Sequence, residues 1–126
     1  MPPIAQLLAL MAALLHVGFF YLESIAFARP ATWARFGLTS QTEADIVRPM
    51  AFNQGFYNLF LAMGILGGLA LIATGSADAG RSVVLVACAC MTLAGVVLIA
   101  TDRAMLRAAL MQLIPPLLAI VTALAL

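Results

Sequence analysis

The sequence contains no lysine, a single histidine and only two cysteines, and these shortages exclude several classes of protein. Charged residues make up 9% of the chain, against about a quarter of a soluble domain. Six arginines nearly cancel five acidic residues, leaving a net charge of +1, so the chain lacks the basic surface that nucleic-acid binding requires. One histidine has no companion ligands for a metal, and no nucleotide-binding or serine-nucleophile motif is present. We therefore expect no metal, no cofactor and no nucleic-acid partner.

The two cysteines, Cys88 and Cys90, are two positions apart. On a helix this spacing points them to different faces, so they can neither bridge each other nor share a metal. We expect them to be packing or lipid-facing thiols.

What the sequence has in abundance is apolar residues, at 65% of the chain, with a mean hydropathy of +1.13. These residues gather in four runs, each long enough to cross a bilayer. They predict an all-α fold in which residues 1–126 form a single transmembrane domain, a bundle of four transmembrane helices with spans at about 4–27, 50–74, 82–101 and 108–126.

The distribution of arginine predicts the orientation of these spans. The first and third connections contain five arginines, whereas Arg81 alone lies on the side of the termini. The positive-inside rule then places the first loop in the cytoplasm and both termini outside, most simply in a bacterial inner membrane. The lipid bilayer is the one certain partner that this composition implies.

The long first loop also carries helix signals. Ser40 and Glu43 have the spacing of a capping box, and Pro49 suits the first turn of a helix. We expect a short interfacial helix here, leading into the second span.

Polar side chains within the spans need an explanation, because an unpaired polar group in apolar surroundings costs a few kcal/mol. They concentrate in the cytoplasmic half of three spans, which predicts a polar pocket open to the cytoplasm. The candidate ligand-binding residues are His16, Glu23, Asn53, Gln54, Tyr57, Asn58 and Gln112.

Two of these residues can titrate, so His16 and Glu23 are the catalytic candidates if the protein is an enzyme. They are seven positions apart, on one helix face and roughly 10 Å apart along the axis. His16 could instead be satisfied by a backbone carbonyl or by Asn58, and Glu23 by a salt bridge to Arg29 or Arg107. The asparagines and glutamines could serve only to join helices.

Two further patterns bear on packing. Gly64 and Gly68 form one G-x-x-x-G, which favours close helix contact within the bundle and leaves a homo-oligomer as the alternative. Pro115 and Pro116 interrupt the fourth span beside Gln112, where freed carbonyls would help to open a cavity.

The run from Asn53 to Ala62, NQGFYNLFLA, resembles the signature of a family of small membrane proteins, the domain-of-unknown-function family numbered 1304. His16 followed by Tyr21 and Glu23 is similar to the opening helix of that family. The resemblance covers almost the whole chain, and it implies a fold of four helices and no particular activity.

Three functions fit these observations. The leading hypothesis is binding or transport of a small, partly apolar ligand in the polar cavity. The second is an intramembrane isomerase that uses His16 and Glu23 as an acid/base pair, an idea supported only by a likeness of plan to sterol isomerases of the emopamil-binding type. The third is a structural membrane subunit whose polar groups fix helix register.

Overall fold

The computed structural model describes all residues, 1–126, and every regular element in it is helical. Four long helices dominate, and short helical turns fill much of the connections. The elements are α1 (Pro3–Phe20), the π-helical turn η1 (Tyr21–Ile25), α2 (Pro30–Trp33), the 3-10 turn η2 (Ala34–Phe36), α3 (Gln41–Ala73), α4 (Ala77–Thr101), the 3-10 turn η3 (Arg103–Met105) and α5 (Leu106–Ala125).

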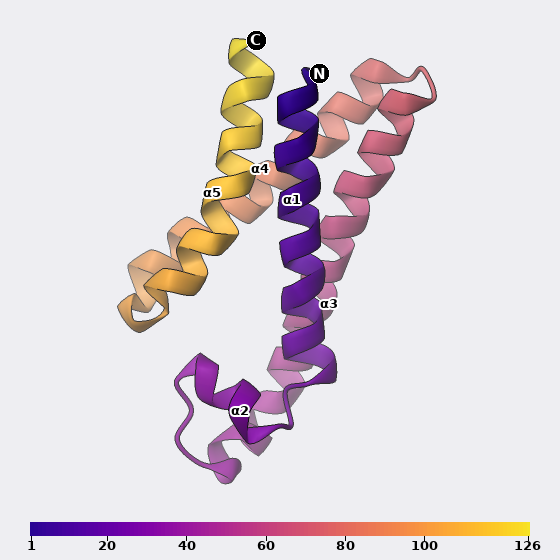
Figure 1. Cartoon of the computed structure of the whole chain (residues 1–126). Helices are drawn as coiled ribbons and strands as arrows, with labels where there is room; N and C mark the ends of the chain where they lie inside the picture. Colours follow the sequence, from indigo (N-terminus) through magenta and orange to yellow (C-terminus); the bar gives the residue numbers. More distant parts are fainter.

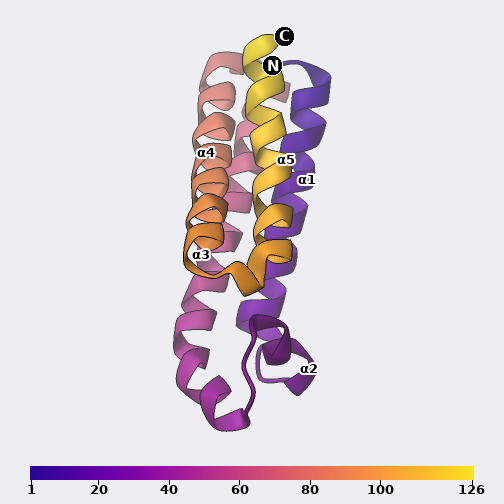
Figure 2. The same cartoon turned by 90° about the vertical axis from the view of Figure 1, so that its left-hand side faces the viewer.

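The long helices form a four-helix bundle, as the apolar runs predict. α1 packs against α3 and α5, and α4 packs against the same two helices from the opposite corner. Both termini and the α3–α4 turn lie at one end, while α2 and the first loop lie at the other (Figures 1 and 2). All four helices, with η1 and η3 as extensions of α1 and α5, are long and apolar enough to cross a membrane.

Small residues bring the helices of the bundle close together. The central core contains Ala9, Ala12 and Ala13 of α1, all without exposed surface. Where α3 crosses α4, a methyl group added to Gly68 would lie 2.8 Å from the Gly80 carbonyl oxygen. The bundle thus depends on close backbone approach, as expected of helices that have no hydrophobic effect to drive them together in lipid.

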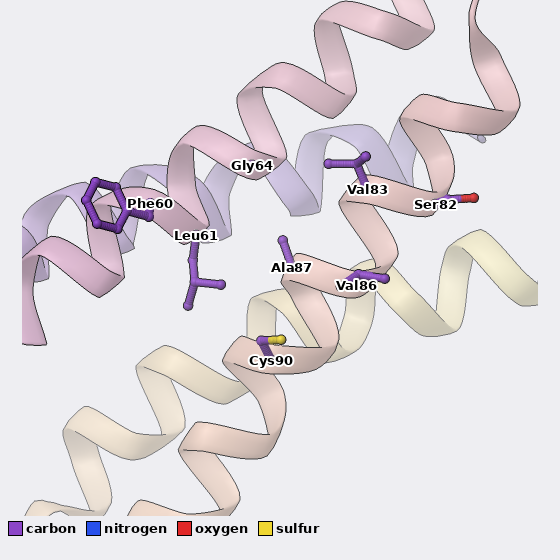
Figure 3. Close-up of a pocket in the computed structure, with 8 residues that line it drawn as sticks. All are labelled: Phe60, Leu61, Gly64, Ser82, Val83, Val86, Ala87 and Cys90. Atoms are coloured by element: carbon purple, nitrogen blue, oxygen red, sulfur yellow. The ribbon is translucent and has the colours of Figure 1, made fainter.

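The G-x-x-x-G pair therefore packs inside the protein. Gly68 lies against α4, and a methyl on Gly64 would lie 3.8 Å from the Ala87 side chain of the same helix. Beside Gly64 is an apolar hollow of about 390 Å³, with Phe60 and Leu61 of α3 on one side and Cys90 of α4 on the other (Figure 3). A homo-oligomer through Gly64 and Gly68 stays a prediction, and these intramolecular contacts count against it.

The helix expected in the first loop, leading into the second span, forms as the beginning of α3, and α2 is a further short helix in that loop. Ser40 caps α3 as expected, since its Oγ accepts a hydrogen bond from the Glu43 N–H at 3.2 Å. The helix then runs without a break from Gln41 to Ala73, with Pro49 inside it rather than in its first turn. Pro49 and Asp45, whose carbonyl loses its donor to the proline, are both exposed, so water can satisfy that carbonyl.

The prolines of α5 behave similarly. Pro115 and Pro116 are both buried inside a helix that continues from Leu106 to Ala125. Met111 and Gln112, on the preceding turn, line the cavity at the first-loop end, and a role of the prolines in opening it stays a prediction.

Candidate functional site: a polar cavity at the first-loop end

The largest hollow in the protein lies where the helix pairs diverge. At the first-loop end, the α4–α5 hairpin splays away from α1 and α3 (Figure 1). Between them is a cavity of about 900 Å³, lined by α1 and η1, η2, α3, α4, η3 and α5. Its volume falls in the upper part of the range for small-molecule sites. The sequence predicted a polar pocket at this end, and a cavity is present there.

Glu23 lies in the middle of η1, the turn that follows α1. The turn is wound more loosely than an α-helix, since the Ala26 N–H donates to the Tyr21 carbonyl five residues back, at 2.8 Å. Such π-helical turns are rare and occur frequently at functional sites, because the extra residue redirects the side chains around it. Here the redirected turn places Glu23 in the cavity wall.

The Glu23 carboxylate has one hydrogen-bond partner, on α3. Asn58 Nδ2 donates to Glu23 Oε2 at 2.6 Å, a short distance that is typical of a bond to a charged acceptor. Asn58 is 5% exposed, so the amide is fixed within the bundle. Glu23 does not form the salt bridge to Arg29 that was considered from the sequence. Arg29 instead donates a hydrogen bond to the Tyr21 hydroxyl.

A close approach of α3 to η1 makes this contact possible. Gly55 faces Ser24 and Glu23 so tightly that an added methyl would lie 3.1 Å from the Glu23 Cβ. One turn away, Ser24 Oγ donates to the Phe52 carbonyl at 2.7 Å. Gly55 and Ser24 were missed as site residues from the sequence. The signal that could have found them is a pair of small residues adjoining polar ones on two spans.

The remaining polar candidates separate into two groups. Gln54 and Gln112 line the same cavity as Glu23, so residues from three spans do come together. Asn53 and Tyr57 do not line it, although both are exposed, Tyr57 at 58%. Of the four polar candidates on α3, Gln54 and Asn58 line the cavity.

His16 lies apart from the cavity. It has no exposed surface, and its Nδ1 hydrogen-bonds the Ala12 carbonyl, four residues back, at 2.9 Å. Its Nε2 is buried without a partner, and the ring packs edge-on against Phe19 at 5.4 Å. The backbone carbonyl considered from the sequence is therefore a partner of His16, and Asn58 bonds Glu23 instead.

Two arginines of the cavity wall were not among the sequence candidates. Arg35 enters from η2 in the first loop, and Arg107 from the first turn of α5. Sequence reasoning counted both among the five arginines that indicate the orientation in the membrane, and considered Arg107 also as a salt-bridge partner of Glu23. Neither could be placed in a cavity before the path of the first loop was known.

The comparisons with known proteins identify a family and add no activity. No curated protein and no solved structure matches the chain. A family model described as "Protein of unknown function (DUF1304)" matches residues 10–124, a range that includes every candidate site residue. The resemblance noted at Asn53 to Ala62 is confirmed, and the chain belongs to this family.

Proposed function

We propose that this protein binds or transports a small amphipathic molecule in the cavity at the first-loop end of the bundle. The observation that carries the proposal is the Glu23–Asn58 pair in the wall of a cavity large enough for such a ligand. A carboxylate held by an amide within an apolar bundle is costly to bury, which is why intramembrane acidic groups commonly mark binding sites or pathways.

The composition of the wall supports an amphipathic ligand. Ten of the 17 lining residues are hydrophobic, among them Leu22, Val97 and Met111. The polar ones include Glu23 and Asn58. Binding sites for small molecules typically combine mostly apolar walls with a few polar groups that fix orientation.

The orientation of the protein in the membrane is part of the proposal. With the first loop in the cytoplasm and both termini outside, the cavity lies in the inner leaflet of a bacterial inner membrane. An alkaline phosphatase fused after Leu126 should then be active, because the enzyme folds only outside the cytoplasm. An inactive fusion, with a fluorescent protein at the same position bright, would contradict this topology.

The two alternative functions receive less support. An isomerase that pairs Glu23 with His16 needs both groups at the substrate, whereas His16 is fully buried and does not line the cavity. A purely structural role would explain the Glu23–Asn58 and Ser24–Phe52 hydrogen bonds. It gives no reason for a cavity of this size beside them.

A tryptophan moved into the cavity wall offers a direct test. The single tryptophan, Trp33 of α2, does not line the cavity, whereas Phe36 does, so the test uses a protein that carries Trp33→Phe and Phe36→Trp. Amphiphiles that share one brominated alkyl chain, with anionic, cationic, zwitterionic or neutral heads, are titrated into the purified protein in maltoside micelles. Bromine quenches tryptophan fluorescence at contact range, so binding in the cavity gives a saturable loss of fluorescence.

Two matched variants distinguish binding in the cavity from partition of the amphiphile into the micelle. Ala94 lines the cavity and Ala100, on the same helix, does not, and both are exposed. Ala94→Phe should weaken the saturable quenching by at least about tenfold, as expected when a binding group is lost or blocked, and Ala100→Phe should leave it unchanged. Ala108→Phe, from α5, is a second filling variant in case the first does not fold. If no head group gives quenching that the filling variants reduce, the proposal is wrong.

A further inference from the structure

Three charged side chains from three different elements line the cavity: Glu23 of η1, Arg35 of η2 and Arg107 of α5. Two of the other four arginines have partners within the protein, since Arg29 donates to Tyr21 and Arg81 donates to a backbone carbonyl. Arg35 and Arg107 donate no hydrogen bond, and both are exposed. Two arginines without a partner in the protein therefore line a cavity that also holds a carboxylate.

One oxygen of the Glu23 carboxylate accepts no hydrogen bond. Glu23 Oε2 is occupied by Asn58, whereas Oε1 has no hydrogen bond and is not among the buried unpartnered atoms, which are in His16 and Trp33. Oε1 thus keeps some exposed surface, on a residue that lines the cavity. A group that donates hydrogen bonds, an ammonium above all, is what such an atom binds best.

The guanidinium groups of Arg35 and Arg107 favour a ligand group of negative charge. Arginine binds phosphate oxygens in a bidentate geometry and keeps its own charge in apolar surroundings. Two arginines and one carboxylate leave a net charge of +1 in the cavity. A head that combines a phosphodiester with an ammonium meets all three groups and brings no net charge of its own into the site.

We propose that the ligand is a single-chain amphiphile whose head joins a phosphodiester to a primary ammonium, as in phosphoethanolamine. Arg35 and Arg107 bind the phosphate, Glu23 Oε1 binds the ammonium, and the apolar wall holds the alkyl chain. This inference rests on the proposed function and specifies its ligand. The same phosphodiester head exists in a soluble molecule without an alkyl chain, glycerophosphoethanolamine, so the test includes both forms.

The test uses quenching of the tryptophan introduced by Phe36→Trp, with brominated alkyl chains that are identical except in the head. One head is phosphoethanolamine, one is phosphocholine, one is a methyl phosphodiester that lacks only the ammonium, and one is a primary amine that lacks only the phosphate. Phosphoethanolamine should bind tightest, by about tenfold over each of the others, because each lacks one charge-assisted hydrogen-bonding group.

Variants assign each contact. Arg107→Gln and Arg35→Gln should each weaken phosphoethanolamine and methyl phosphodiester binding about tenfold and should not weaken amine binding. Glu23→Gln should weaken phosphoethanolamine and leave the methyl phosphodiester unchanged or tighter. Arg103→Gln and Asp45→Asn, exposed and outside the cavity, are the matched controls and should change nothing.

Each outcome bears on the inference separately from the proposed function. Soluble glycerophosphoethanolamine that fails to displace the probe supports a chain-bearing ligand, and displacement as strong as by the alkyl form overturns it. A methyl phosphodiester that binds as tightly as phosphoethanolamine overturns the role of Glu23. If the heads bind equally and Ala94→Phe still blocks all of them, the inference fails while the proposed function stands.

Discussion

Replacing Gly55 with alanine should destabilise the bundle and open the site, although the change adds only one methyl group. The added Cβ would lie 3.1 Å from both the Glu23 Cβ and the Ser24 Cβ, and closer still to the Ser24 hydroxyl. Few real contacts are this tight, and both neighbours belong to η1. η1 and α3 must therefore move apart, which stretches the bond from Ser24 Oγ to the Phe52 carbonyl.

The size of the effect follows from opposing contributions. Crowding one extra methyl into a packed contact costs about 1–3 kcal/mol, and losing a hydrogen bond such as that from Ser24 costs about 1 kcal/mol. Alanine favours the helix over glycine by about 0.8–1.0 kcal/mol. Together these contributions predict that Gly55→Ala lowers the free energy of unfolding by about 2 kcal/mol.

Gly67 of the same helix is the matched control. A methyl there meets nothing within 4 Å, so Gly67→Ala has only the helix preference and should gain up to about 1 kcal/mol. Both variants and the parent are unfolded by titrating sodium dodecyl sulfate into maltoside micelles, with helix content followed by circular dichroism. Equal stability of the Gly55 and Gly67 variants would refute the reasoning, because helix preference would then outweigh the contact with η1.

Three other predictions concern separate parts of the protein. Asn58→Ala removes the only hydrogen bond to Glu23 and should cost about 1–2 kcal/mol in the same unfolding titration; no change would mean that water replaces the amide. Arg81→Gln removes a 2.8 Å bond to the Ala123 carbonyl near the end of α5, and should increase hydrogen exchange of the last turn without unfolding the bundle. A small thiol reagent in micelles should modify exposed Cys90 well before buried Cys88, as shown by mass spectrometry of peptides; equal rates would contradict the assigned faces.

Several features of the candidate site could be predicted from the sequence because membrane physics restricts polar residues so strongly. Glu23, Gln54, Asn58 and Gln112 stand out in apolar runs, and each lies in or beside the cavity. Asn53, Tyr57 and His16 do not line it. His16 shares a helix face with Glu23 only if the helix stays α throughout. The π-helical turn at Tyr21–Ile25 changes that register, and no residue type in it signals the change.

The continuity of α3 through Pro49 could not be predicted from the sequence either. A proline after a polar loop suggests a helix start, and Pro49 would serve as one. Its actual position inside the helix depends on water reaching the carbonyl of Asp45, a property of the surroundings rather than of the local sequence.

The sequence by itself determined that this protein has four membrane-crossing helices, short connections and a polar end, because hydropathy and charge act through composition along the chain. Only the tertiary structure decided which polar groups meet. The Glu23–Asn58 pair depends on Gly55 letting α3 approach η1, and Arg35 and Arg107 reach the cavity through the path of the first loop and the divergence of α4 and α5. Such contacts depend on packing between residues that are distant in the chain. Local sequence patterns do not contain that information.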